Sequence, residues 1–343
     1  MRVAISGGAG FLGLHLARRL LADGHAVRLL DLAPLDDPPL AGRVDELTGD
    51  VRVPADARRL VDGVDVVVHA AAALPIQSSR EAIRSVNVQG TAEVLTAALE
   101  AGVRRAVLIS STAVYGVPEK HPILEEDPLV GVGWYGESKI DAERLCAEVT
   151  RRGLETVIVR PKTFVGPERL GVFEILFDWI REGRRVPILG SGANRYQLLA
   201  VEDLVDAVVR CFDGPVAGEA LNIGAGVFGT VRDDLGALCA HAGSGARLRS
   251  VPARPAGIVL RGLELAHLSP LAEWHYKTAY RDSYVSIEKA RSLLGWEPRF
   301  SNAETLCATY DWYLAHRGEM RGAGVTHRVP WDQRALGLLK RLS

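Results

Sequence analysis

The sequence predicts an α/β protein with a doubly wound parallel sheet and a smaller, interleaved C-terminal α/β unit. In the first half, short runs of Val, Ile and Leu alternate with longer helical patterns, which is the order that parallel β-α-β units require. A glycine-rich turn joins the first of these strands to the first helix. After about Pro161, Gly and Pro become more frequent and longer connections separate the helical patterns, so we expect the second unit there.

Each expected strand of the first half is a short apolar run, as is typical of strands that helices cover on both faces. These strands are Arg2–Ser6, Ala26–Asp31, Asp65–His69, Arg105–Ser110 and Glu155–Arg160. The helices expected between them are Phe11–Ala22, Pro54–Val61, Ser79–Ala101 and Tyr135–Arg152. Further helical patterns follow at Val201–Phe212, Val231–Ala242, Ile287–Leu294 and Asn302–Ala315.

The higher content of Gly and Pro and the longer connections after Pro161 predict two interleaved domains. Residues 1–165, completed by segments around 195–225, form the first, and residues 166–194 and 226–320 form the second. Residues 321–343 form a C-terminal tail that ends in a short, basic, amphipathic stretch. We expect the tail to pack against the body or a sister subunit, with peripheral membrane contact as the alternative.

Composition excludes several classes of protein. With 343 residues, 24% of them charged, and a net charge of -1, no overall field draws the chain to nucleic acid or to an anionic membrane. The four cysteines are scattered without a C-x-x-C pair, which argues against a disulfide framework and a zinc site. No signal peptide precedes the first strand and no apolar run approaches the ~20 residues of a membrane span. We therefore expect a cytoplasmic protein.

The turn Gly7–Gly13 carries three glycines at i, i+3 and i+6 between a strand and a helix. Gly7 permits a tight turn, Gly10 lets the backbone approach a pyrophosphate, and Gly13 lets the helix pack closely on the strand. The helix N-terminus then offers free N–H groups and its dipole to the phosphates. This position predicts a Rossmann dinucleotide site.

Asp31 ends the second strand, about twenty residues beyond the glycines. A carboxylate there accepts hydrogen bonds from the ribose hydroxyls and repels a 2′-phosphate, which favours NAD over NADP. Arg28 is a counter-argument, but it lies inside the strand rather than after its end. Other residues expected at the cofactor are Asp50 and Val51 at the adenine edge, and Ala70, Ala71 and Ala72 after the third strand.

Tyr135 and Lys139 lie at i and i+4, on one face of a predicted helix. Proton exchange with a carbinol oxygen needs a group that titrates near the working pH, whereas free Tyr titrates at about 10. A neighbouring ammonium favours the phenolate and lowers that pKa. Ser111, at the end of a strand, supplies a hydroxyl for the same substrate oxygen.

These motifs, in this order, resemble the NAD-dependent epimerase/dehydratase family of extended short-chain dehydrogenases/reductases, which includes UDP-galactose 4-epimerase. The segments that carry the resemblance are Gly7–Gly13, His69–Ala72, Asn87–Thr91, Ser111, Tyr135 with Lys139, Arg160–Pro161 and Leu294–Pro298. The resemblance implies that Ser111 is the catalytic hydroxyl, Tyr135 the acid/base, and Lys139 the ribose anchor. It also places Phe11, Leu12 and Asn87 at the cofactor, and Arg160 and Pro161 near the nicotinamide.

The two residues after Ser111 limit the types of reaction that we expect this chain to catalyse. Related sugar-nucleotide dehydratases carry Asp-Glu there, whereas this chain has Thr112-Ala113 and so lacks the acid and base for elimination. We expect an NAD-dependent epimerase of a nucleotide-activated sugar that works through transient oxidation to a ketone. The alternative is an NAD-dependent oxidoreductase acting on a keto-sugar or on a non-sugar secondary alcohol.

The substrate half departs from the family pattern. Thr163 stands where nucleotide-sugar epimerases often carry an Asn that contacts the diphosphate, and Ala200 replaces the usual His. The apolar run 198–201 motivates the non-sugar alternative. For Trp134, Lys162, Arg195 and Gln197 a purely structural role stays open. The candidates are Ser111, Thr112, Trp134, Lys162, Thr163, Arg195 and Gln197.

Two further expectations concern assembly and activity. Related enzymes commonly pair through two helices per subunit, here Ser79–Ala101 and Tyr135–Arg152, so we expect a homodimer. A catalytically silent NAD-binding regulator of the same fold is the hypothesis from another class. It is disfavoured because every expected catalytic residue is present.

Overall fold

A seven-stranded parallel sheet forms the centre of the larger half of the protein, with strand order β10-β6-β5-β4-β1-β2-β3. The computed structural model describes residues 1–74, 78–168, 170, 173–253, 255–258, 261 and 278–317. The strands are β1 (Arg2–Ser6), β2 (Ala26–Asp31), β3 (Asp45–Thr48), β4 (Val66–His69), β5 (Arg105–Ile109), β6 (Glu155–Pro161) and β10 (Ala220–Ile223). The doubly wound α/β class is therefore confirmed.

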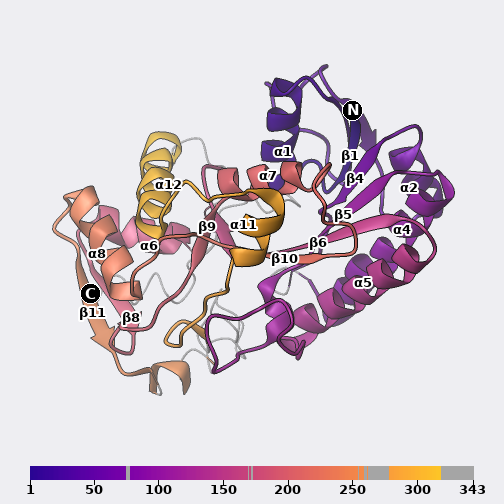
Figure 1. Ribbon diagram of the computed structural model, residues 1–343. Coiled ribbons are helices and arrows are strands. Elements are labelled where there is room, and N and C mark those ends of the chain that lie inside the picture. The colour runs from indigo at the N-terminus through magenta and orange to yellow at the C-terminus, as the bar shows by residue number, and fades with distance from the viewer. Residues whose placement is uncertain are drawn as a thin grey trace.

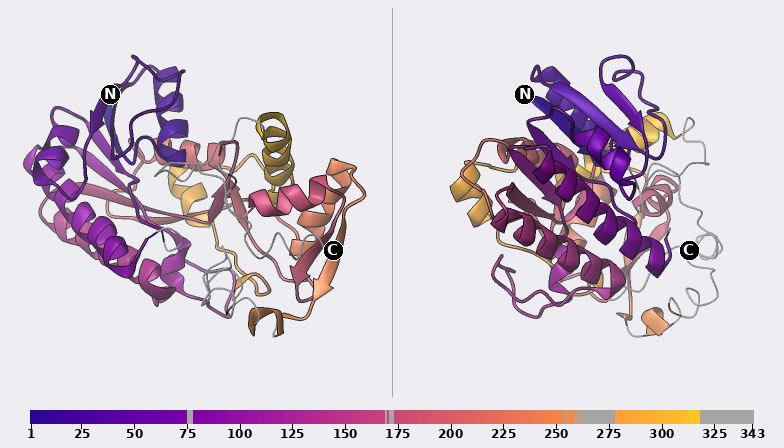
Figure 2. Two further views of the ribbon diagram at one scale, coloured as in Figure 1. Left: turned by 180° about the vertical axis from the view of Figure 1, so that it is seen from behind. Right: turned by 90° about the vertical axis from the view of Figure 1, so that its right-hand side faces the viewer.

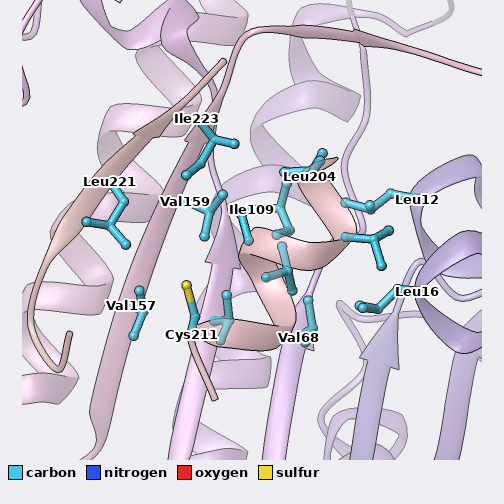
Figure 3. Close-up of a cluster of buried hydrophobic side chains, with 14 of the residues drawn as sticks. Leu12, Leu16, Val68, Ile109, Val157, Val159, Leu204, Cys211, Leu221 and Ile223 are labelled. Carbon is cyan, nitrogen blue, oxygen red and sulfur yellow. The ribbon is translucent and has the colours of Figure 1, made fainter. Parts of the chain in front are cut away.

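Helices cover both faces of this sheet, as Figures 1 and 2 show. One layer holds α1 (Phe11–Ala22) and α7 (Val201–Arg210); the other holds α2 (Pro54–Val61), α4 (Gly90–Glu100) and α5 (Gly133–Arg151). Successive side chains of β1 point to opposite layers: Val3 and Ile5 join the core with α1 and α7, whereas Ala4 joins the other. Figure 3 shows the first of these cores between Leu12, Leu204 and the strands.

Two strands of the sheet were not predicted, and both lie at an edge. β3 has the sequence Asp-Glu-Leu-Thr and is largely exposed. It therefore lacks the apolar run by which the other strands were predicted. β10 is a short strand that pairs with β6 from about sixty residues further along the chain. The expected helix Ser79–Ala101 is divided into α3 (Arg80–Arg84), a π-helical turn (Ser85–Gln89) and α4.

A second body of buried side chains lies beyond the sheet. Its elements are β7 (Thr163–Val165), α6 (Phe173–Arg181), β8 (Arg185–Leu189), β9 (Leu198–Ala200), α8 (Val231–Ala242), β11 (Arg247–Val251) and α12 (Asn302–His316). Helix α11 (Glu288–Leu294) instead packs into the core of the central sheet, through Ala290 and Leu294. Phe177, Leu238 and Tyr310, from α6, α8 and α12, pack together there, and Figure 1 shows these helices beside β8 and β11 at one end of the molecule. The exact division into two domains stays a prediction.

Local signals explain why the later helices begin where they do. Thr230 and Ser301 each close a capping box with the acidic residue three positions on, at the start of α8 and α12. Gly243 and Gly295 adopt left-handed conformations just past α8 and α11, as helix C-termini favour. The predicted tail, residues 321–343, lies outside the described residues. Within the described part of the chain, no helix has the length and apolar character of a membrane span.

Candidate active site

A cavity of about 250 Å³ opens at the carboxyl ends of β1, β2, β4 and β5, which is where open α/β sheets place their ligands. Most of the predicted cofactor residues line it. They are Gly7, Gly10, Phe11, Leu12, Gly13, Asp31, Asp50, Val51, Ala70, Ala71, Ala72, Tyr135 and Lys139. The structure therefore brings the glycine turn and the Tyr–Lys pair to one cavity.

The glycine turn is packed so tightly that side chains are excluded at Gly7, Gly8 and Gly13. Gly7 has φ +75°, and a Cβ there would lie 2.8 Å from the backbone nitrogen of Ala71. A Cβ at Gly13 would lie 2.3 Å from the carbonyl oxygen of Gly7. No side chain caps α1, and a helix N-terminus presents backbone N–H groups and the positive end of its dipole. These features suit a diphosphate at the helix N-terminus.

Asp31 is held in place by the backbone. Its Oδ2 accepts a hydrogen bond from the Ala9 N–H at 3.0 Å, and its Oδ1 accepts one from the Ala33 N–H at 3.1 Å. Burial raises the pKa of Asp31, while these N–H groups oppose the rise. Arg28 is engaged elsewhere, donating to Asp45 at 2.6 Å and to the Asp62 carbonyl at 2.7 Å. The carboxylate at the cavity and the diverted arginine fit NAD.

Lys139 is a buried amine in the wall of the cavity, close to Tyr135. Its Nζ donates to the Ile109 carbonyl oxygen at 2.9 Å and lies 5.9 Å from the centre of the Tyr135 ring. Burial lowers the pKa of Lys139 to about 8, while the carboxylate of Glu143 acts to raise it. The amine is thus fixed next to the tyrosine that it was predicted to assist.

Ser111 lies outside the lining of the cavity, and so does Thr112. The Ser111 hydroxyl caps a 3-10 turn (Thr112–Tyr115) by accepting the Ala113 N–H at 3.1 Å. Its neighbour Ser110, which the sequence did not single out, lines the cavity and donates to Glu143 Oε1 at 2.5 Å. Two adjacent hydroxyls therefore stand at the end of β5, with different partners.

Asn87 and Arg160 do not line the cavity. They contact residues that surround it. Asn87 donates to Ser138 Oγ at 3.0 Å and holds both backbone groups of Ala73, so it ties the loop after β4 to α5. Arg160 forms a buried ion pair with Glu143 at 2.7 Å and also donates to the hydroxyl of Tyr115. Pro161 is the last residue of β6 and does not line the cavity.

Lys162 and Thr163 lie where the chain leaves the central sheet. Lys162 is 4% exposed, and its Nζ donates to Ser283 Oγ at 2.7 Å and lies 5.1 Å from the centre of the Tyr196 ring. Burial lowers the pKa of Lys162 to about 7. The hydroxyls of Thr163 and Tyr196 are 3.3 Å apart. Neither residue lines the cofactor cavity.

The remaining candidate substrate contacts are spread over the second half and the start of α5. The Arg195 guanidinium lies over the rings of Phe228 and Tyr284, at 4.5 and 4.8 Å. Gln197 is buried, donates to the Ala225 carbonyl and accepts the Val285 N–H, which is a structural position. Trp134 is 53% exposed and lies 5.3 Å beneath the Arg80 guanidinium.

Phe164 is a residue that the sequence reasoning missed. It lines the cavity and stacks on Phe11 with ring centres 5.8 Å apart and an angle of 4° between the planes. Phe11 opens α1 at the glycine turn. No motif marks Phe164, because only the folded chain brings the segment after β6 onto α1.

A cavity that joins a dinucleotide-binding glycine turn to a Tyr–Lys pair defines the class of nicotinamide-dependent enzymes that act at a carbinol or carbonyl carbon. The comparison with protein families agrees. Residues 3–224 match the model described as the NAD dependent epimerase/dehydratase family. The chain belongs to this family, and NAD is its cofactor.

Two relatives illustrate the range of reactions. A UDP-glucose 4-epimerase of Mycolicibacterium smegmatis is 28% identical over 332 residues, covering 91% of this chain and 98% of the relative. A 3 beta-hydroxysteroid dehydrogenase/Delta 5→4-isomerase of Mycobacterium tuberculosis is 29% identical over 353 residues, covering 93% of this chain and 92% of the relative.

A solved structure shares the fold over almost the whole chain. It is a UDP-glucose 4-epimerase of Thermotoga maritima with UDP-glucose, and it superimposes with a TM-score of 0.78 at 23% identity. The match covers 92% of this chain and 100% of that one. The predicted family and fold are thus confirmed.

Proposed function

We propose that this protein is an NAD-dependent epimerase of a nucleotide-activated sugar. The observation that carries the proposal is the single cavity lined by the glycine turn, Asp31, Tyr135 and Lys139. It unites dinucleotide binding with a proton-handling pair, which epimerisation through a transient ketone requires. The relative named UDP-glucose 4-epimerase, which spans nearly the whole chain, supports the same choice.

The lining of the cavity offers a group for each part of the cofactor. The Gly7–Gly13 turn would hold the diphosphate, Asp31 the adenosine ribose, and Lys139 the nicotinamide ribose. When bound, NAD accepts a hydride from a carbinol carbon and can return it. The small residues Ala70, Ala71 and Ala72 form the adjoining wall of the cavity.

Tyr135 exchanges the proton of the reacting hydroxyl. The Lys139 amine, held by the Ile109 carbonyl, stabilises the phenolate by its charge. The hydroxyl of Ser111 would hydrogen-bond the same substrate oxygen, with Thr112 beside it. In this assignment, proton transfer belongs to the tyrosine, and the lysine and serine orient and polarise.

Epimerisation is favoured over elimination because Thr112 and Ala113 follow Ser111. Neither side chain can donate or accept a proton near neutral pH, so water loss from the ketone would lack its acid and base. The ketone is then reduced again on either face. Trp134, Lys162, Thr163 and Arg195 stay candidate substrate contacts, whereas we assign Gln197 to the framework.

A second candidate is an NAD-dependent oxidoreductase acting on a secondary alcohol that is not a nucleotide sugar. Thr163 and Tyr196 hydrogen-bond each other at the point where related epimerases use an Asn for the diphosphate. The relative named as a hydroxysteroid dehydrogenase has an extent and identity similar to those of the epimerase.

One experiment separates the two. Protein loaded with NAD is incubated with UDP-glucose and, in parallel, with a 3β-hydroxysteroid, while product and NADH are measured. The proposed function predicts interconversion of UDP-glucose and UDP-galactose, or of another nucleotide-sugar pair, without net NADH. Net NADH formed only with the steroid would replace the proposal by the second candidate.

We also keep a homodimeric, cytoplasmic enzyme as part of the proposal. The pairing helices would be α3–α4 and α5, which contact each other within the subunit. Sedimentation at micromolar protein concentration tests this: a single species of twice the mass of the 37.0 kDa chain is expected.

A further inference from the structure

One face of α1 carries a row of three side chains toward the segment 163–168. Phe11, His15 and Arg18 are spaced i, i+4 and i+7 on the helix, so they lie one above another on a single face. The segment 163–168 includes β7, which follows β6 directly, and leads away from the central sheet. We call the contacts between this row and this segment the α1 clasp.

The contacts of the clasp follow one another in order along both partners. Phe11 stacks on Phe164, and the ring of His15 lies within hydrogen-bonding distance of the Pro167 carbonyl, at 3.3 Å. Arg18 then forms an ion pair with Glu168, at 2.8 Å between Nη1 and Oε1. The segment is therefore attached to α1 at three successive points over two helical turns.

Arg18 joins the segment to a third part of the chain. Its Nη2 also pairs with the carboxylate of Asp37, which is buried and accepts the Leu40 N–H. Asp37 follows β2, the strand that ends at Asp31. One guanidinium thus links the segment after β6, helix α1 and the loop after β2, and the two ion pairs raise the pKa of Arg18.

The backbone of the segment is closely confined. A Cβ at Gly166 would lie 2.5 Å from Val201 Cγ1 at the start of α7, so the chain passes between α7 and α1 without room for a side chain. Glu168 has φ +74°, a conformation that side-chain residues avoid and glycine tolerates. A glutamate there is favoured by its carboxylate, which meets Arg18 and lies 3.9 Å from His15 Nε2.

The clasp acts on the cofactor cavity through Phe164. Of the described residues that line the cavity, Phe164 alone comes from beyond α5 in the sequence. Its ring lies on Phe11, beside the turn that would hold the diphosphate. Any outward movement of the segment 163–168 removes this ring from the cavity wall.

We propose that the ion pair of Arg18 with Glu168 holds Phe164 on the bound dinucleotide and so slows its release. Arg18 and Glu168 are positioning residues, because they act through Phe164 and do not line the cavity. The inference rests on NAD binding and not on the identity of the substrate. A retained cofactor suits a reaction that returns the electrons it takes, whereas a dehydrogenase must exchange its cofactor at each turnover.

The test measures release of the cofactor rather than turnover. Protein loaded with NADH is mixed with excess NAD, and the loss of bound-NADH fluorescence gives the dissociation rate. Glu168→Gln is expected to accelerate release about tenfold, the effect of losing one charge-assisted contact of ~1.4 kcal/mol. Arg18→Met also loses the pair with Asp37 and is expected to accelerate release by at least as much. Arg19→Met is the matched control: Arg19 pairs with Asp23 and Asp206 and makes none of the clasp contacts.

The variant Glu168→Gly separates the effect of the clasp on NADH release from any effect on the stability of the protein. Glycine accepts the φ of +74°, so relief of the backbone strain opposes the loss of the ion pair, and the melting temperature of this variant should stay close to that of the parent. Its NADH should nevertheless dissociate about as fast as from Glu168→Gln. The proposal is overturned if Glu168→Gly and Arg18→Met release NADH at the rate of the parent and of Arg19→Met. A failure of epimerase activity alone would leave these rates, and this inference, unaffected.

Discussion

The amine of Lys139 donates a hydrogen bond to the carbonyl oxygen of Ile109, 30 residues earlier in the chain, at 2.9 Å. This bond joins α5 to the last residue of β5. Because it fixes a buried amine 5.9 Å from the centre of the Tyr135 ring, the strand sets the geometry of the proton-handling pair.

Replacing Tyr135 by Phe tests the role of the phenol. The change removes one hydroxyl and keeps the ring, so we expect NAD binding to persist while turnover falls by about 10²–10⁴-fold. The assay is the interconversion of nucleotide sugars, with cofactor binding followed separately by fluorescence. Arg144→Met, at an exposed position of α5 where the side chain pairs with Asp141, is the control for disturbance of α5. Unchanged turnover in Tyr135→Phe would exclude the proposed catalytic role and would favour a silent NAD-binding regulator.

Replacing Lys139 by Met tests the electrostatic argument. Without the ammonium, the pKa of Tyr135 should be higher, so the acidic limb of the pH–rate profile should move to higher pH. The lysine pKa of about 8 also predicts that its assistance in the parent declines as the pH rises through 8. A profile of the same shape in both proteins would contradict this assignment.

Replacing Asp31 by Asn tests the choice of cofactor. Loss of the carboxylate removes a charged acceptor for the ribose hydroxyls and the repulsion of a 2′-phosphate. We expect the affinity for NAD to fall about tenfold and the preference for NAD over NADP to shrink by more. Titration with both dinucleotides gives the ratio. Asp213→Asn, whose exposed carboxylate pairs with Arg104, should leave it unchanged.

Replacing Lys162 by Met tests what burial of this amine does to stability. In the folded protein its pKa is about 7, against 10.5 for the free side chain. Below pH 7 both states carry the proton and the folded state bears the full unfavourable free energy of a buried charge. Between pH 7 and 10.5 only the unfolded state keeps the proton, so folding becomes relatively more favourable as the pH rises.

Lys162→Met should therefore raise the free energy of unfolding by ~1–3 kcal/mol at pH 6, and by less at pH 9. Denaturant titration at the two pH values measures it. Lys120→Met, at an exposed ion pair with Asp127, should show little change at either pH. A destabilised Lys162→Met variant would mean that the contact with Ser283 outweighs the desolvation of the amine.

Replacing Gly13 by Ala tests the packing of the glycine turn. The new Cβ would meet the Gly7 carbonyl oxygen at 2.3 Å, so the turn must shift. We expect a loss of ~1–3 kcal/mol in stability and much weaker NAD binding. Gly236→Ala in α8 has nothing within 4 Å of its Cβ and should instead stabilise by roughly 0.5–1 kcal/mol. Equal effects of the two changes would remove the packing argument.

The sequence by itself determined the core of the dinucleotide unit. β1, the turn at Gly7–Gly13, α1 and β2 follow one another directly, so local signals of apolar period and glycine spacing mark each boundary; the observed bounds of β1, α1 and β2 are those predicted. The pairing of Tyr135 with Lys139 is likewise local, since one helical turn separates them. These segments predicted the cofactor, and together with Ser111 and the other short motifs along the chain they predicted the family.

Only the tertiary structure decided which distant residues meet them. Ser110 and Ser111 are adjacent residues that both follow β5, and only the path of the folded chain decides that Ser110 lines the cavity. The sequence made Gln197 a candidate substrate contact. In the structure its side-chain amide forms hydrogen bonds with the backbone of Ala225 and Val285 and so has a structural role. Phe164 lines the cavity from a segment whose Glu168 pairs with Arg18, 150 residues earlier in the chain. Such contacts have no local signal, because they depend on where the whole sheet and its helices place segments far apart in the chain.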